Sequence, residues 1–235
     1  HVGVRLDVPA TATVMRLRHG RDERVVLGEG VCPFYSDLDA FAMAEAAVDE
    51  GVRRVLAAGA RWDRLCALDN FCWPDPIASD HTPDGEHKLA QLVECCRGLR
   101  DACEAYGLPL VSGKDSMKND FRGLDKSCRP ITISVLPTLM VTAMARGRTG
   151  IACGSDFKLP GDVIYVLGDS EASFCASEYA AHFKVDDAVP LPLDTARSMA
   201  LYRRIHAALH SREAELLGVA GEILIAHDGD RYELI

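Results

Sequence analysis

The chain has 235 residues, which is enough for one large domain or two smaller ones. Hydrophobic residues make up 48% and charged residues 26%, proportions that allow a buried core and exclude a disordered or fibrous chain. The 26 basic and 35 acidic residues give a net charge of −9, which argues against a general binder of nucleic acid or of anionic membranes.

The apolar runs and the cysteines narrow the class of protein further. No apolar run reaches the roughly 18–20 residues that a membrane helix needs. The nine cysteines form no CxxC pair, so we expect reduced thiols, mostly in the core, of a cytoplasmic protein. Because the chain begins at His1 rather than at Met, we also expect a fragment or a processed piece.

The first thirty residues predict a pair of strands. Apolar and polar residues alternate over 14–18, and residues 25–27 form a second apolar run after the turn-like segment 19–22. Residues 28–33 are expected to be a loop. A dinucleotide-binding GxGxxG motif fails there, because Pro33 stands where the third glycine should be.

A long amphipathic helix follows. Ser36 and Asp37 are typical helix caps, apolar residues then recur at steps of three and four, and Gly59 is a typical stop. The residues on the opposite face of this helix are charged, which predicts that this face is solvated. Its charged residues, Asp49, Glu50, Arg53 and Arg54, include two weak candidates for metal ligands, Asp49 and Glu50.

The next segment ends a predicted strand with two oxygen-bearing side chains. Residues 64–68 are expected to be a buried strand that leads into the ordered loop 69–76. Asp69 and Asn70 are suitable oxygen ligands for Mg²⁺ bound with phosphate. The alternative is a simple turn in which Asp69 caps the backbone while Phe71 and Trp73 pack on the core.

A second helix over 87–106 is expected to end at Gly107 and to be followed by a strand over 108–111. A glycine turn at the end of that strand would free backbone N–H groups to bind phosphate, with a lysine adding charge. The alternative is an ordinary capped turn. The residues concerned are Gly113, Lys114, Asp115 and Ser116.

The remaining elements complete a mixed α/β, or α+β, pattern. Strands are expected at 131–136 and 138–145, and the glycines and prolines of 151–162 indicate a domain boundary. Beyond this boundary we expect a strand at 163–167, helices at 171–183 and 195–210, and a strand at 222–226. The order of elements predicts two domains.

Two motifs together carry a resemblance to a known family. Leu68-Asp-Asn-Phe-Cys-Trp73, a helix, and then Pro109-Leu-Val-Ser-Gly-Lys-Asp-Ser-Met-Lys-Asn119 resemble the second half of phosphoribosylformylglycinamidine synthases. The entry helix also looks similar, and the likeness covers about residues 12–212. It implies an α+β fold like that of aminoimidazole ribonucleotide (AIR) synthetase, PurM, with an N-terminal-type domain over 1–148 and part of a C-terminal-type domain over 149–235.

The resemblance also implies an activity. Synthases of this family use ATP and Mg²⁺ to phosphorylate the amide of formylglycinamide ribonucleotide, and ammonia from a glutaminase partner or domain then displaces the phosphate. Residues Gly113–Ser116, with Asp69 and Asn70, would contact nucleotide and substrate. The family's catalytic histidine belongs to its first half, so no catalytic residue is expected in this chain.

The chain departs from the family at several positions. Lys114 stands where relatives carry a Mg²⁺-binding Asn, and Arg54 ends the helix motif where relatives often have Asn. Residues 213–235 do not fit the family, and His227-Asp228 echoes a later family motif only loosely.

Two consequences follow for function. The first is an alternative role as a non-catalytic, auxiliary nucleotide-binding half, or as another ATP-dependent enzyme of the same superfamily. The second concerns partners: without the missing first half, sheet edges would stay unpaired, so we expect a homodimer or larger assembly.

Overall fold

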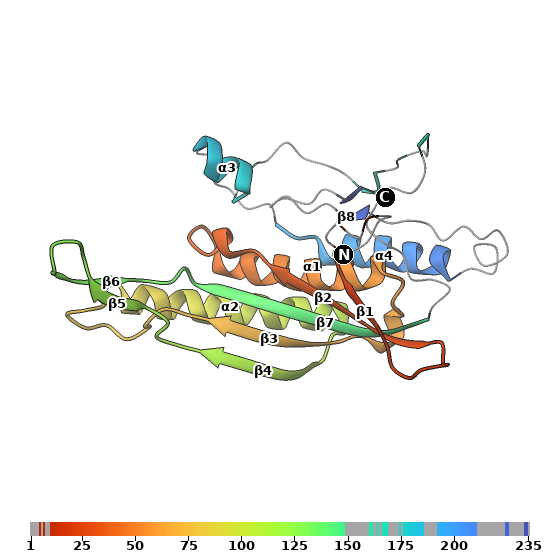
Figure 1. Cartoon of the computed structure of the whole chain (residues 1–235), viewed down its shortest axis with the longest axis horizontal. Coiled ribbons are helices and arrows are strands. Elements are labelled where there is room, and N and C mark those ends of the chain that lie inside the picture. The colour runs from red at the N-terminus through yellow and green to blue at the C-terminus, as the bar shows by residue number, and fades with distance from the viewer. Residues whose placement is uncertain are drawn as a thin grey trace.

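The computed structural model describes residues 10–148, 176–185 and 192–210 continuously, together with positions 5, 7, 160, 161, 164, 166–168 and 174 and the strands 224–225 and 233–234. The main body is a five-stranded sheet with the order β1-β2-β7-β3-β4 (Figure 1). Its strands are β1 (Thr13–Arg16), β2 (Glu23–Val31), β3 (Cys66–Cys72), β4 (Leu110–Ser116) and β7 (Thr138–Arg148). A separate hairpin consists of β5 (Phe121–Leu124) and β6 (Pro130–Ile133).

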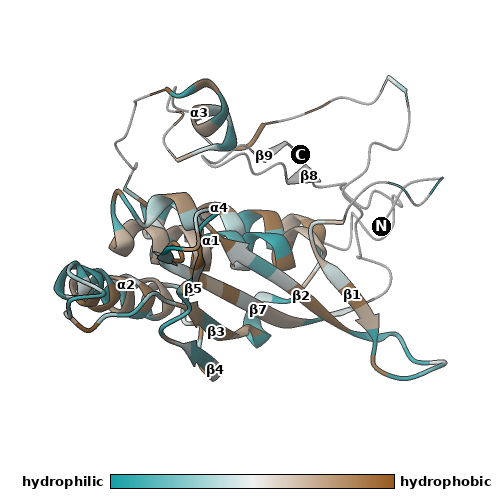
Figure 2. Ribbon diagram, turned by 60° about the vertical axis from the view of Figure 1, so that its left-hand side comes forward, coloured by the Kyte–Doolittle hydropathy of each residue, from teal (hydrophilic) through white to brown (hydrophobic). Residues whose placement is uncertain are grey.

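Helices cover one side of this sheet. They are α1 (Ala40–Ala57) and α2 (Gly85–Tyr106), while α4 (Thr195–Leu209) packs on both of these helices and the short α3 (Glu178–Phe183) lies apart. Figure 2 shows α1 and α4 stacked above the strands. Among the described residues, no helix is long and apolar enough to cross a membrane.

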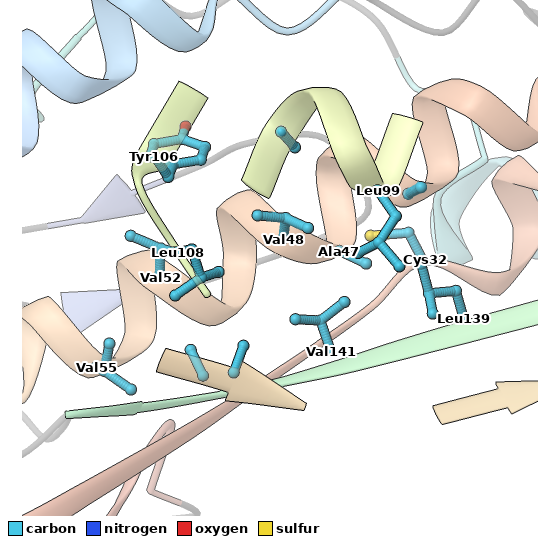
Figure 3. Packing of buried hydrophobic residues seen from close by; sticks show 14 of the residues in the cluster. Cys32, Ala47, Val48, Val52, Val55, Leu99, Tyr106, Leu108, Leu139 and Val141 are labelled. Atoms are coloured by element: carbon cyan, nitrogen blue, oxygen red, sulfur yellow. The ribbon is translucent and has the colours of Figure 1, made fainter. Parts of the chain in front are cut away.

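Strand alternation explains which face the helices cover. Along β7, Leu139, Val141, Ala143 and Ala145 are buried, while the residues between them are half-buried or exposed on the opposite side. Figure 3 shows the buried β7 side chains meeting those of α1 and α2 in one cluster. The opposite face, here called the open face, is lined by Met15, Val25, Leu27, Val31, Leu68, Met140 and Met144.

The strand pair was predicted correctly, but the loop expected at residues 28–33 is wrong. Residues 28–31 continue β2. The two glycines in this stretch, Gly28 and Gly30, have no side chain and so let α1 approach the strand closely. A Cβ atom at Gly30 would lie 1.9 Å from the carbonyl oxygen of Ala47. Glycine is therefore required here by packing against the helix and not by a turn.

Helix α1 differs from expectation at its start and on its polar face. Its N-cap is Asp39, which accepts a hydrogen bond of 3.0 Å from the Ala42 N–H, and not Ser36 or Asp37. The charged face is not solvated: Asp49, Glu50 and Arg53 are buried, because α1 lies between the sheet, α2 and α4.

Helix α2 agrees well with its prediction. It ends at Gly107, whose φ of +62° places it in the left-handed region that favours glycine. The hairpin strand β5 was not foreseen. The seven described cysteines are all free thiols, as expected, but only Cys32 and Cys95 are buried, so the expectation of mostly core cysteines is wrong.

The C-terminal third is described in part. Helix α4 confirms the helix expected at 195–210, whereas α3 covers only the end of the one expected at 171–183. The strand near 222–226 corresponds to the two-residue β8 (Leu224–Ile225), which pairs with β9 (Glu233–Leu234). Residues 151–159, most of the strand expected at 163–167, and His227-Asp228 lie outside the described residues, and the domain division at 148 stays a prediction.

Candidate functional site

The two sequence motifs lie on neighbouring strands. Strands β3 and β4 run parallel, and their register pairs Asp69 with Gly113, Asn70 with Lys114, and Cys72 with Ser116. Helix α2 makes the crossover that a parallel connection requires. All six candidate residues for nucleotide or substrate binding therefore lie in the carboxyl-terminal halves of β3 and β4. Figure 1 shows these two strands next to each other.

The local conformation differs from the predicted loops. Strand β3 continues through Asp69 and Asn70 to Cys72, and β4 continues through Gly113 to Ser116. Gly113 is not among the described glycines with positive φ. The expected glycine turn is therefore wrong, because Gly113 lies within β4, which pairs with β3 in a parallel ladder.

Alternation along the two strands divides the six residues between the two faces of the sheet. Asn70, Lys114 and Ser116 lie on the open face, and the ammonium group of Lys114 donates a hydrogen bond to the hydroxyl of Ser116. We call these three residues the open-face row. The sequence prediction had assigned all six residues to nucleotide or substrate binding, and the alternation of side chains along a strand places only three of them on this face.

The other three residues face the helices. Asp69 lies on the same side as the buried Phe71, and its carboxylate lies over Gly113. Burial raises the pKa of Asp69, and the charge of Asp115 on the next strand adds to the shift. We call Asp69, Gly113 and Asp115 the helix-side row.

The open-face row has the chemistry of an anion site. A lysine ammonium group carries a full charge and three donors, and only one of its hydrogen bonds goes to Ser116. The hydroxyl of Ser116 and the amide of Asn70 add neutral donors beside it. The row is exposed at Lys114 and half-buried at Asn70 and Ser116, so a ligand has access to it.

The two weak metal candidates have other partners. Asp49 accepts hydrogen bonds from the hydroxyls of Tyr106 and Tyr202, with Arg53 Nε 3.7 Å from its Oδ2. Glu50 accepts one of 3.0 Å from the Val31 N–H and forms an ion pair with Arg54.

A metal centre made by this chain has little support in the geometry. Within the part of the chain that the structure describes, no three His, Cys, Asp or Glu side chains come together to hold a metal ion. The carboxylates nearest the open-face row, Asp69 and Asp115, lie on the opposite face. A metal role for Asp49 and Glu50 stays a prediction.

Sequence reasoning missed the residues that join the ends of β3 and β4. The Trp73 N–H donates to the Ser116 carbonyl at 2.8 Å, and the Asn119 N–H donates to the Trp73 carbonyl at 3.1 Å. Asp75 is buried beside them. The sequence signal was an Asp between two prolines in a loop expected to be ordered. The structure adds that Asp75 is buried, and a buried carboxylate needs partners from elsewhere in the chain.

Comparison with known proteins places this arrangement in a family. Residues 10–136, more than half of the chain, match the model described as "AIR synthase related protein, N-terminal domain". The chain belongs to the AIR synthase related family. The matched segment contains the whole of β3, α2 and β4, so both rows lie inside the family domain.

Individual relatives share one name. The chain is 33% identical over 180 residues to phosphoribosylformylglycinamidine synthase subunit PurL of Trichormus variabilis, covering 73% of this chain and 22% of that protein. It is 30% identical over 229 residues to the PurL of Anaeromyxobacter sp. strain K, covering 92% of this chain and 26% of that protein. The chain thus spans about a quarter of the length of these curated relatives.

Solved structures support the same fold. Thermotoga maritima PurL complexed with ADP superposes with a TM-score of 0.58 at 20% identity, covering 95% of this chain and 33% of that one. AaThiL complexed with AMPPCP and TMP gives 0.51 at 16% identity, covering 86% and 56%. The expected AIR synthetase-like, mixed α/β fold is therefore confirmed.

Proposed function

We propose that this chain is the second AIR synthase-type half of a phosphoribosylformylglycinamidine synthase and that its open-face row binds ATP. One observation carries the proposal: Asn70, Lys114 and Ser116 form a polar row on the open face, inside the segment that matches the family. The named PurL relatives and the fold shared with nucleotide-bound PurL support it.

The reaction of the whole enzyme would be an ATP-dependent formation of a carbon–nitrogen bond. The γ-phosphoryl group of ATP passes to the amide oxygen of formylglycinamide ribonucleotide, which makes that oxygen a good leaving group. Ammonia then attacks the same carbon, the new C–N bond forms, the C–O bond breaks, and phosphate leaves. This chain would supply part of the nucleotide site and would be inactive alone.

Each residue of the open-face row would have its own part in binding. The ammonium group of Lys114 would lie against the phosphates of ATP, where a point charge is most effective. The hydroxyl of Ser116 and the amide of Asn70 would donate to phosphate or substrate oxygens. The helix-side row would act indirectly, because Asp69 and Asp115 lie on the side of the sheet that α2 covers and Gly113 leaves room for the Asp69 carboxylate.

Magnesium would arrive with the nucleotide. Among the described residues no three His, Cys, Asp or Glu side chains converge, so this chain offers no cage for a free Mg²⁺ ion, whereas an ion that enters with a nucleotide needs only one or two carboxylates beside the phosphates. A protonated lysine cannot ligate Mg²⁺, so Lys114 would instead neutralise phosphate charge. We therefore assign no step of the reaction to a metal bound by this chain.

The open face would also be the surface that pairs with another AIR synthase-type domain. Met15, Val31 and Leu68 lie on this face and are 47%, 40% and 37% exposed. Exposed apolar side chains that share one face mark an interaction surface, whereas scattered single ones need no explanation. The natural partner would be the first half of the synthase, or in isolation a second copy of this chain. A glutaminase would deliver ammonia to the completed enzyme in the cytoplasm.

Sedimentation velocity tests this pairing with two matched variants. Leu68→Lys places a charge on the open face and should convert an assembly of the isolated chain to monomers. Val93→Lys is the control, because Val93 on α2 is 43% exposed on the helical side. A wild-type chain that stays monomeric at high concentration would contradict pairing between copies.

A second candidate function is an auxiliary nucleotide site that holds ATP or ADP for stability. Lys114 favours this alternative, because it provides charge where relatives have a Mg²⁺ ligand. The two functions differ in turnover. An auxiliary site retains nucleotide through gel filtration and leaves it unhydrolysed when the rest of the enzyme is present, whereas an active site consumes it.

Calorimetric titration tests the proposed binding directly. Mg·ATP, inorganic triphosphate and adenosine are titrated separately into the wild-type chain. If Lys114 binds the phosphates, Mg·ATP and triphosphate bind saturably and adenosine binds at least about tenfold more weakly, a difference of about 1.4 kcal/mol. Absence of any binding would show that this chain forms no nucleotide site without a partner.

A further inference from the structure

The segment that follows β4 is attached to the segment that follows β3. Trp73, fully buried after β3, donates its N–H to the Ser116 carbonyl and accepts the N–H of Asn119 through its own carbonyl. The side-chain amide of Asn119 also donates to the Ser116 carbonyl at 2.9 Å. The position of Ser116 at the end of the open-face row is therefore fixed by the turn at residues 117–120.

That turn has a strained backbone. Lys118 has a φ of +61°, in the left-handed region that is unfavourable for a residue with a Cβ atom. Such conformations persist only where surrounding contacts determine them, and they are enriched at functional sites. The contacts that hold Lys118 therefore decide whether the turn keeps its shape.

Asp75 supplies these contacts from the neighbouring segment. Its side chain is only 8% exposed, and its Oδ2 lies 3.4 Å from Lys118 Nζ and 3.6 Å from Arg122 Nη2. Its other oxygen accepts the Ile77 N–H at 3.1 Å, which fixes the carboxylate on its own loop. One buried carboxylate thus faces a cation within the turn, Lys118, and a cation on the strand that follows it, Arg122 of β5.

A second line of contacts supports the same turn from α2. The Asp75 N–H donates to Asp120 Oδ2 at 3.1 Å, and the other oxygen of Asp120 accepts the hydroxyl of Ser134 at 2.9 Å. Lys88 of α2, itself buried, donates to that hydroxyl at 2.6 Å. The turn therefore rests on a helix as well as on the loop after β3.

We propose that Asp75 is a positioning residue for the open-face row. By holding Lys118 and Arg122 it keeps the turn after β4 closed, and the closed turn fixes Ser116 and the adjacent Lys114 in register with Asn70. This inference rests on the proposed function, because it assigns the turn to the nucleotide site. Asp75 itself would touch no substrate.

The experiment combines hydrogen exchange with nucleotide titration on the full chain. Asp75→Asn removes the charge of the side chain and keeps its shape. The matched control is Asp125→Asn, because Asp125 pairs with Arg129 in the loop that joins β5 to β6, at the end of that hairpin away from Asp75. Exchange is followed by mass spectrometry in peptides covering 71–77 and 113–121, and Mg·ATP affinity is measured by calorimetry.

If Asp75 positions the row, Asp75→Asn speeds exchange in both peptides and weakens Mg·ATP binding at least about fivefold. Asp125→Asn changes neither. Unchanged exchange in Asp75→Asn overturns the proposal, and so does faster exchange with unchanged affinity. Equal losses of affinity in both variants would also overturn it, since any disturbance of the β5–β6 hairpin would then weaken binding and Asp75 would have no particular role.

A second variant covers the case in which Asp75→Asn does not fold. Lys118→Asn keeps a residue that tolerates the left-handed conformation but removes the cation, so exchange in the 113–121 peptide should rise and affinity should fall. If the wild-type chain binds no nucleotide, the proposed function fails. The exchange measurements then still decide whether Asp75 holds the turn.

Discussion

The carboxylate of Asp69 lies directly over the backbone of Gly113, so that a Cβ atom built at Gly113 would come within 2.7 Å of Asp69 Oδ1. The missing side chain at Gly113 therefore leaves room for the Asp69 carboxylate, and the glycine lies in a strand and not in a turn. The same relationship places Asp69 on the helix side, away from Lys114. It separates the residues that can meet a ligand on the open face from those that hold the strands together.

Replacing Gly113 tests this packing. Gly113→Ala should destabilise the chain by about 0.5–1.5 kcal/mol, because the Asp69 carboxylate must leave its preferred rotamer to admit the new methyl group. The free energy of unfolding is measured by urea denaturation.

The control is the same substitution in an Asp69→Ala background. There the methyl group has room, and alanine is favoured over glycine in a strand by roughly 0.5–1 kcal/mol, so the penalty should vanish or reverse. A penalty that is equal in both backgrounds would mean that Asp69 is not the residue that excludes a side chain at position 113.

The sequence predicted the fold better than it predicted the site. Apolar periodicity located α1 and α2, and the left-handed Gly107 marked the end of α2, because these signals are local. The glycines at 28 and 113 misled, since both resemble turn residues. Their cause is a close approach by a distant element, α1 in one case and Asp69 in the other, which the local sequence does not contain.

The polar residues show the same limit. The sequence placed Asp49 and Glu50 on a solvated face, but the structure buries both. The pattern of one helix cannot reveal that α4 packs on it through Tyr202, which follows Asp49 by 153 residues. The resemblance assigned both motifs to nucleotide or substrate binding, and the structure pairs them on neighbouring strands. Only the parallel register of β3 and β4 could assign their residues to opposite faces.

Tyr202 tests how α4 is held. Its hydroxyl lies 2.9 and 3.1 Å from the two oxygens of the buried Asp49, and its ring stacks on Tyr106. Tyr202→Phe should lower the free energy of unfolding by about 1.5–3 kcal/mol, because a buried carboxylate loses a donor. Tyr179→Phe is the control, since Tyr179 is 43% exposed on α3. An effect of Tyr202→Phe as small as that of the control would contradict the assigned contact.

Two histidines at the C-terminal end of α4, one in its last turn and one at its C-cap, are expected to make the chain less stable in acid. The rings of His206 and His210 lie 4.2 Å apart. Burial lowers the pKa of both histidines. For His206 the charges of His210 and Arg61 lower the pKa further and that of Asp63 raises it. For His210 a hydrogen bond with the Ala60 backbone and the charge of Asp63 raise the pKa, and the charge of Arg61 lowers it. Because their pKa values in the folded state lie below the ordinary value of about 6.5, their contribution to stability is present above that pH and is lost as the pH falls.

The check is urea denaturation at about pH 7.5 and about pH 5. The wild-type chain should lose more free energy of unfolding between these conditions than a variant carrying His206→Gln and His210→Gln. Equal losses in the two proteins would mean that folding does not lower the pKa of these imidazoles.

The central claim is that nucleotide meets the open-face row and not the helix-side row. The most direct test compares two adjacent residues of β4 that point to opposite faces, Lys114 and Asp115. Mg·ATP affinity is measured by calorimetry for Lys114→Met and for Asp115→Asn, beside the wild-type chain. We expect Lys114→Met to lose at least about tenfold in affinity and Asp115→Asn to stay within about twofold. A larger loss in Asp115→Asn than in Lys114→Met would place the nucleotide on the helix side and contradict this account.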